Sequence, residues 1–297
     1  MADQLQMILL AADCPNESRQ DESKPFRPLK ADVRPRPALK PQGRQNGAGI
    51  IRTGSIASLV LLDPARGIAI KRYRPGPLVR ALYWFCFQAG FPYMSNVDAL
   101  EAARERRLIA GLLLKAELGR EVVAPIMAVR FERGRGELIS QFIAGGYPRD
   151  GRHARLFLDQ ASEILGEAGL NLWQVWRWNP KAVSNLVETA SGEYRIIDLE
   201  SSLVTPPVPN AHFWSNLAAG AFPVFDDINF GFLREYVAQR AGLLHETLGE
   251  DGFAELNASM KRCHEHMHAW KDREPRLWGR LVALLLKPFP IRQTACH

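Results

Sequence analysis

Three oxygen-bearing side chains in the second half of the chain could together hold a divalent cation. Asn185 and Asp198 flank a predicted β-hairpin, residues 186–198, whose natural two-residue turn is Ser191-Gly192. Pairing outward from that turn sets Asn185 opposite Asp198, and directly opposed residues lie about 4.5–5.5 Å apart. Glu200 follows on the same side of an extended chain. Because hard divalent cations prefer oxygen ligands, we expect Asn185, Asp198 and Glu200 to be metal ligands. The alternative is that Asn185 and Asp198 only cap strand ends.

A lysine early in the chain is the second group that could do chemistry. Lys71 lies in a strand predicted over residues 68–73, among apolar neighbours. Burying an unpaired ammonium is costly, so an inward-pointing Lys71 needs a carboxylate partner. A helix predicted over residues 97–117 offers Glu101 and Glu105. The alternative is a solvated lysine that points outward, which is the commoner case for any single lysine.

The elements that must position these residues divide the chain into a strand-rich half and a helix-rich half. Short strands are predicted at 49–52, 59–62, 68–73, 122–130 and 137–143. The helix over 97–117 interrupts them, an amphipathic helix follows at 155–169, and helices and loops dominate after 211. This order favours an α+β fold of two lobes. We expect a disordered Pro/Arg-rich leader over 1–47, a small antiparallel-sheet lobe over 48–143 and a mainly helical lobe over 144–290.

In order and rough spacing, the motifs between residues 49 and 205 resemble the protein-kinase-like superfamily. Gly54-Ser55-Ile56-Ala57 is similar to a reduced phosphate-covering loop, and Lys71 to the strand lysine that holds phosphates. Glu105, followed one turn later by an apolar residue, is similar to the helix glutamate that pairs with that lysine. Residues 137–143 resemble the strand leading to the hinge, and Asp198-Leu-Glu200 resembles the metal-binding motif.

The resemblance implies a bilobal kinase-like fold with ATP and Mg²⁺ as cofactors, and a hinge near residues 142–146. It implies nucleotide contacts from the following residues: Gly54, Ser55, Ala57, Lys71, Glu105, Gln141 and Ile143. Residues 71–80 are similar to a stretch in bacterial kinases that phosphorylate the lipopolysaccharide core. The implied activity is therefore phosphoryl transfer to a small molecule or an envelope glycan.

The chain departs from the family at the catalytic loop. The family's proton-accepting Asp would stand five residues before Asn185, where this chain has Pro180, and residues 173–185 contain no carboxylate. Asn179 could occupy the site if the loop holds one extra residue, but an amide is a poor general base. Lys181 could stabilise the transferring phosphoryl group. Two interpretations follow: an atypical phosphotransferase, or a pseudokinase scaffold that binds nucleotide without turnover.

A competing motif lies near the end of the chain. Residues 264–268, His-Glu-His-Met-His, match HExxH, in which two histidines on one helix face bind zinc and the glutamate acts as base. The charged residues Lys261 and Arg262 lie just before this run. A third zinc ligand would have to follow it, and only Asp272, Glu274 and His297 could supply one. A surface helix that happens to be rich in histidine is the default interpretation, and a zinc metallopeptidase is a remote third function.

Net charge and its distribution limit the classes of partner that this chain is expected to bind. The net charge is +6 with a pI near 9.3, but much of the excess lies in the first fifty residues. That distribution argues against nucleic acid, which calls for a basic stripe on a folded face. A nucleotide, together with a small-molecule, glycan or lipid acceptor, is the expected set of partners.

Cysteine usage and hydropathy bear on the compartment. Four cysteines lie far apart with no CxxC pair, which is typical of a reducing compartment. No window reaches the ~18–20 apolar residues of a membrane-spanning helix. Residues 72–91 and 277–289 could lie on a membrane surface, although ordinary packing is commoner. We expect a cytoplasmic protein, with peripheral contact at the inner face of the membrane as the alternative.

Overall fold

The structure is a computed structural model. It describes residues 51–54, 58–77, 80–81, 91–170, 172, 174–175, 179, 181–200 and 228–271. The predicted leader, most of the segment 72–91 and all of 277–289 therefore lie outside the described residues, as do Ser55, Ala57 and Pro180.

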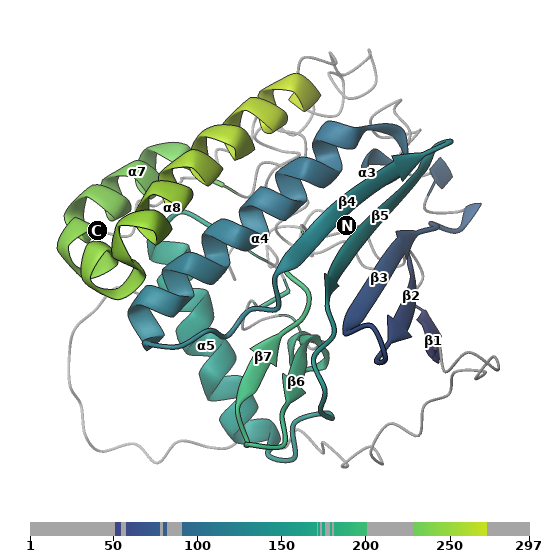
Figure 1. Cartoon of the computed structure of the whole chain (residues 1–297), viewed down its shortest axis with the longest axis horizontal. Coiled ribbons are helices and arrows are strands. Elements are labelled where there is room, and N and C mark those ends of the chain that lie inside the picture. The colour runs from purple at the N-terminus through teal and green to yellow at the C-terminus, as the bar shows by residue number, and fades with distance from the viewer. Residues whose placement is uncertain are drawn as a thin grey trace, which may run out of the picture.

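A five-stranded antiparallel sheet forms one side of the molecule (Figure 1). Its strands run in the order β1 (Ile51–Gly54), β2 (Ser58–Asp63), β3 (Ile68–Tyr73), β5 (Arg135–Gln141) and β4 (Ile126–Glu132). The strand predicted over 68–73 is confirmed, and the α+β class is correct. β4 and β5 lie nearer to their turn than predicted, because Arg133 and Gly134 both have positive φ and close the hairpin in two residues.

Helix α4 (Val97–Leu118), which follows the short α3 (Pro92–Ser95), is the central element. The side chain of Asn96 caps it by accepting from Asp98 N, and Gly119 ends it in the left-handed conformation. Twelve of its residues are buried, and three of these are the charged residues Glu105, Arg106 and Arg107. A helix buried on so much of its circumference needs partners on several sides, and its charges need specific ones.

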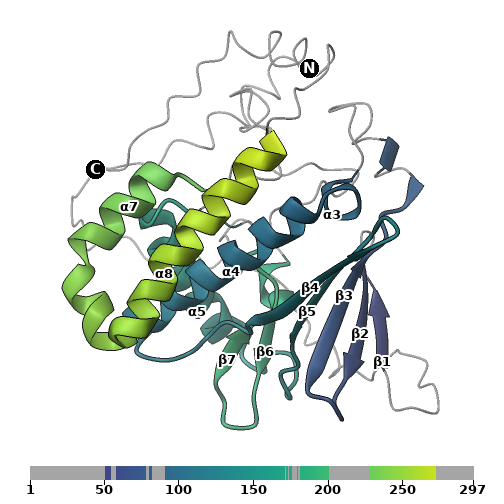
Figure 2. The ribbon, with the colours of Figure 1, turned by 45° about the horizontal axis from the view of Figure 1, so that its top comes forward.

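Those partners are the sheet on one side and α8 on the other. Figures 1 and 2 both show α4 between the sheet and α8 (Ala241–Lys271), whose helical path is broken at Gly249. α7 (Phe230–Gln239) packs beside α8, and α5 (Gly151–Glu167) packs across α4. α5 begins earlier than predicted, because Asp150 caps the backbone N–H groups of Arg152 and His153. Among the described helices, none combines the length and the apolar content needed to cross a bilayer.

The predicted hairpin is present, but its register differs from the prediction by one residue. β6 (Leu186–Glu188) pairs with β7 (Tyr194–Ile196), so Glu188 lies opposite Tyr194. Thr189 N donates to Glu193 O, which leaves a three-residue loop with Gly192 at φ 80°. Asn185, at the end of η1 (Ala182–Asn185), therefore accepts at its carbonyl from Ile197 N and does not pair with Asp198. The predicted pairing of Asn185 with Asp198 is wrong.

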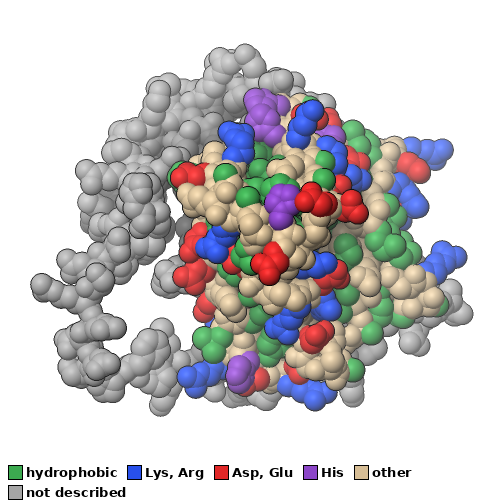
Figure 3. Space-filling view, turned by 60° about the vertical axis from the view of Figure 1, so that its left-hand side comes forward, with side chains coloured by type: hydrophobic (Ala, Val, Ile, Leu, Met, Phe, Trp, Pro, Cys, Tyr) green, Lys and Arg blue, Asp and Glu red, His purple; other side chains and the backbone are tan. Residues whose placement is uncertain are grey.

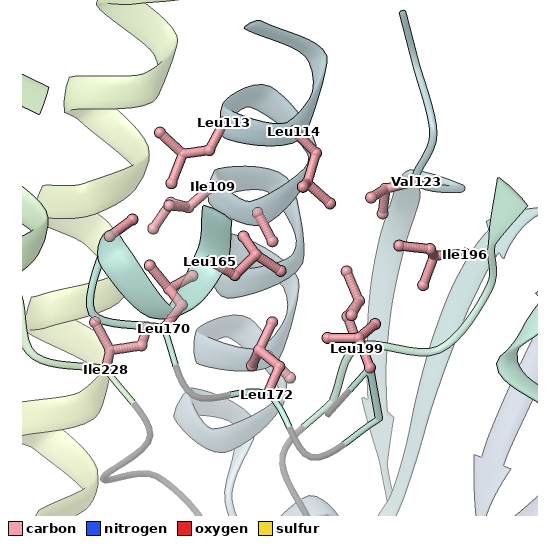
Figure 4. Packing of buried hydrophobic residues seen from close by; sticks show 14 of the residues in the cluster. Ile109, Leu113, Leu114, Val123, Leu165, Leu170, Leu172, Ile196, Leu199 and Ile228 are labelled. Carbon is pink, nitrogen blue, oxygen red and sulfur yellow. The ribbon is translucent and has the colours of Figure 1, made fainter. Parts of the chain in front are cut away.

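One continuous core joins these parts. Figure 4 shows Ile109, Leu113 and Leu114 of α4 close to residues that come from α5 and from the exit of β7. Leu199 and Ile196 are fully buried there. Asp198 and Glu200 flank Leu199 in the irregular segment that follows β7, so the burial of Leu199 holds both carboxylates next to the core.

Candidate functional site

Lys71 of β3 meets the two carboxylates that follow β7. Its Nζ lies 2.9 Å from Asp198 Oδ2 and 2.9 Å from Glu200 Oε2, and its side chain is 19% exposed. Lys71 shares a face of β3 with Tyr73, and the ammonium lies 5.6 Å from the centre of the Tyr73 ring. The lysine therefore points inward, and the groups that the sequence placed in different halves of the chain share one site.

Glu200 is the more deeply held of the two carboxylates. Its side chain is 2% exposed, and its second oxygen, Oε1, accepts from Arg107 Nη1 at 3.4 Å. Arg107 also donates to the carbonyl of Ile197 at 2.7 Å. Burial opposes ionisation of Glu200 and is the largest influence on it, but Lys71 and Arg107 outweigh that influence, so the pKa of the Glu200 carboxyl is lowered. Both oxygens of Glu200 are occupied by protein cations, which disagrees with its expected role as a metal ligand.

Asp198 is placed differently. Its side chain is 30% exposed, and Oδ2 carries the bond to Lys71. Oδ1 is buried and has no hydrogen-bond partner among the described residues. An orphaned carboxylate oxygen of this kind is what a hard cation would complete.

Asn185 presents a matching group at the end of η1. Its Nδ2 donates to Gln174 O at 2.9 Å, which fixes the amide and leaves its oxygen as the atom available to a ligand. Asn185 and Asp198 thus each carry an oxygen of the kind that Mg²⁺ prefers. No cluster of three or more His, Cys, Asp or Glu side chains suited to a metal occurs among the described residues.

Glu105 does not pair with Lys71, so that prediction is wrong. Its fully buried carboxylate accepts from Ser259 Oγ at 2.6 Å and from Arg262 at 2.9 Å, both on α8, and from Arg104 at 2.6 Å. Burial again opposes ionisation, and Arg262, Ser259 and Arg104 together overcome it, so the pKa of Glu105 is lowered. The hydrogen bond that Arg262 donates to Glu105 raises the pKa of Arg262. Glu105 therefore joins α4 to α8 and lies outside the lysine site.

The two catalytic-loop candidates have structural roles. Asn179 Oδ1 accepts from Lys181 N at 2.9 Å, the geometry of an Asx turn, and its carbonyl accepts from Arg155. Lys181 is exposed. The Asx turn holds the Asn179 side chain, and no ion pair joins Lys181 to Asp198 among the described residues.

The expected nucleotide contacts are only partly described. Gly54 ends β1 opposite Leu59, whereas Ser55 and Ala57 lie outside the described residues. Gln141 and Ile143 line a pocket of about 260 Å³ that also takes in the loop after α4 and the β6–β7 hairpin. Lys71 and Asp198 do not line this pocket. The lining residues are Glu121, Val123, Gln141, Phe142, Ile143, Ala144, Thr189 and Arg195.

The HExxH run lies on the surface of α8. His264 and His268 are exposed, with ring centroids 4.6 Å apart, and His264 packs edge-on against Phe230. The face that carries α7 and α8 intersperses charges of both signs (Figure 3), and Lys261 forms an ion pair with Glu265 at 3.9 Å. Asp272, Glu274 and His297 lie outside the described residues. The described part of the chain thus shows a solvated helix face at this motif.

The sequence did not predict the buried ion pair of Arg107, or the contacts that Ser259 and Arg262 of α8 form with Glu105. A signal for Arg107 existed, since Glu105-Arg106-Arg107 is a charged run inside a helix with apolar residues on more than one side. Such charges must find buried partners. No local pattern could indicate Ser259, which meets Glu105 across 154 residues of sequence.

The two lowered carboxyl pKa values predict acid sensitivity. A carboxyl whose folded pKa lies below its unfolded value of about 4.3 adds stability above that value and loses it as the pH falls through the folded pKa. Below about pH 4.5, Glu105 and Glu200 should each contribute up to about 1.4 kcal/mol per pH unit to the fall in the free energy of unfolding. Urea titrations between pH 7 and pH 3 measure this. Glu105→Gln should reduce the slope, and an unchanged slope would contradict the assignment; Glu265→Gln on exposed α8 controls for loss of charge.

In comparisons with known proteins, neither the protein-family models nor the curated proteins gave a match to this chain.

Proposed function

We propose that this chain is an atypical, bilobal kinase-like phosphotransferase that uses ATP and Mg²⁺. The sheet of antiparallel strands in the order β1-β2-β3-β5-β4, with its helix α4 between β3 and β4, supports the first lobe. Residues 142–146 lead from β5 into the helical part, and Gly146 pairs with Glu188 of β6. These features support the hinge and the second lobe of the proposal.

The observation that carries the proposal is the contact between Lys71 and Asp198. These residues are 127 positions apart in sequence, and their charged atoms lie 2.9 Å apart. A strand lysine beside a carboxylate is the pairing needed to hold a nucleotide phosphate and its cation together. A purely structural ion pair would leave unexplained why Oδ1 of Asp198 is buried without a hydrogen-bond partner among the described residues.

Each residue has a defined task in this proposal. Asp198 and Asn185 would hold Mg²⁺ through their oxygens, and the metal would neutralise charge that develops on the transferring phosphoryl group. Lys71 would release Asp198 and bind phosphate oxygens with the same ammonium. Because phosphoryl transfer depends mainly on positioning and charge, the missing carboxylate of residues 173–185 does not by itself forbid turnover. The acceptor we propose is a small molecule or an envelope glycan.

A second function, nucleotide binding without turnover, is favoured by one observation. Asn179 Oδ1, the nearest candidate for the base, is held by Lys181 N in a turn. A scaffold of this kind would keep Lys71, Asn185 and Asp198 for binding and would need no proton acceptor.

Calorimetric titration with Mg·ATP, followed by an assay for phosphate release, tests both functions. We expect the wild-type chain to bind, and Lys71→Met and Asp198→Asn each to weaken binding by about tenfold or more, since a charge-assisted bond is lost. Lys115→Met, which removes an exposed lysine of α4, is the matched control. Release of phosphate supports the phosphotransferase, and binding without release supports the scaffold. Absence of binding by a folded wild-type chain would overturn both.

A further inference from the structure

We propose that Glu200 and Arg107 form a positioning pair that holds Lys71 toward the nucleotide, in place of the helix glutamate expected at Glu105. This inference rests on the proposed function, because it concerns how the phosphate-binding lysine of that function is kept in place. It assigns Glu200 a role as a positioning residue and removes it from the metal ligands.

The two carboxylates that contact Lys71 are not equivalent. Asp198 is 30% exposed, and one of its oxygens has no hydrogen-bond partner within the part of the chain that the structure describes. Glu200 is 2% exposed, and its other oxygen is bound to Arg107, which is equally buried. If Glu200 left Lys71, it would remain buried beside Arg107, and if it left Arg107, a buried guanidinium would lose its charge partner. Asp198 can therefore exchange Lys71 for a cation while Glu200 keeps its place.

The geometry of α4 explains why Arg107 takes this task and Glu105 does not. Helical residues two positions apart are separated by about 200° around the axis, so residues 105 and 107 face nearly opposite directions. Glu105 contacts Ser259 and Arg262 of α8, whereas Arg107 contacts Glu200 and the carbonyl of Ile197. Helix α4 therefore contacts Lys71 indirectly, because its Arg107 binds Glu200 and Glu200 binds Lys71.

Charge balance supports the same assignment. Lys71 and Arg107 face Asp198 and Glu200, which makes two cations and two anions around one site. When a divalent cation draws Asp198 away, Glu200 remains as the counter-charge of Lys71. The lysine then stays anchored at one side while its remaining hydrogens are free for phosphate oxygens.

The first test reads the position of Lys71 without any nucleotide. Wild-type and variant chains are treated briefly with an amine-acylating reagent, and the acylation rate of Lys71 is measured by mass spectrometry. Glu200→Gln should raise that rate about tenfold or more, whereas Asp198→Asn should raise it less than threefold, because Glu200 still holds the amine. Equal rates in both variants, or a larger increase in Asp198→Asn, would overturn the proposal. Should Glu200→Gln fail to fold, Asp198→Asn decides alone, since a freed Lys71 there contradicts the pair.

The second test separates positioning from metal binding. If Glu200 acts through Lys71, Lys71→Met and the double variant Lys71→Met/Glu200→Gln should bind Mg·ATP equally weakly, because coupled residues are not additive. A further loss in the double variant, or a rise in the Mg²⁺ concentration needed by Glu200→Gln, would overturn the proposal in favour of a structural or metal-ligand role. A wild-type chain that binds no Mg·ATP refutes the proposed function, whereas the acylation test decides the pairing separately.

Discussion

Replacing Glu105 with alanine should lower the free energy of unfolding by about 3–5 kcal/mol, the range seen when one member of a buried ion pair is removed. The carboxylate is fully buried and accepts from Ser259, Arg262 and Arg104. Without it, the Ser259 hydroxyl loses its carboxylate partner, and Arg262 and Arg104 are left with Glu255 and Glu101. Chemical denaturation at neutral pH, read by far-UV circular dichroism, measures the change.

Glu101→Ala is the matched control, since Glu101 lies one turn earlier on α4 and pairs with Arg104 at a partly exposed position. We expect its effect to stay within about 1 kcal/mol. The interpretation of Glu105 as a structural residue fails if Glu105→Ala keeps its stability and instead loses nucleotide binding. That result would restore the pairing with Lys71 that the sequence predicted.

Replacing Gly145 with alanine should lower the free energy of unfolding by about 1–3 kcal/mol, the usual range for overpacking. A Cβ at Gly145 would lie 2.3 Å from the carbonyl oxygen of Glu188 and 2.6 Å from Val187 Cγ1. The first of these atoms belongs to the backbone of β6, so the strand itself would have to move. Thermal or urea unfolding of the variant measures the loss.

The neighbouring Gly146 supplies the control for this prediction. A Cβ there would meet nothing within 4 Å, so Gly146→Ala should change stability by less than about 0.5 kcal/mol. Equal effects of the two substitutions would mean that the close approach between the hinge segment and β6 does not exist. A large effect at Gly145 alone would show that this segment and the hairpin are packed as described.

Local patterns predicted the elements well where one simple rule applied. The strand 68–73 lies between a breaker-rich turn and a change of composition, so both of its ends were visible in the sequence. The hairpin 186–198 was predicted in the right place but with the wrong register, because Ser191-Gly192 satisfies the two-residue rule as well as the three-residue loop that forms. Positive φ at Gly192 is compatible with both turns, and packing of Ile196 and Leu199 decides between them.

The candidate site was predictable in its long-range pairing but not in its details. Lys71 and Asp198 followed from the order of motifs, and the structure brings them together. The partner of Glu105 could not be predicted in this way, because a helix with charges on several faces offers no local evidence of which face meets which element. Only the position of α8 sends Glu105 to Ser259 and leaves Arg107 for Glu200.

The contact of α4 with α8 also bears on the order of events during synthesis. Glu105 and Ser259 are separated by 154 residues. At about 5–20 residues per second, the ribosome takes about 8–30 s to make that interval. Throughout this delay Glu105 of α4 lacks its partners on α8. The sheet half of the nascent chain therefore cannot reach its final packing before α8 emerges.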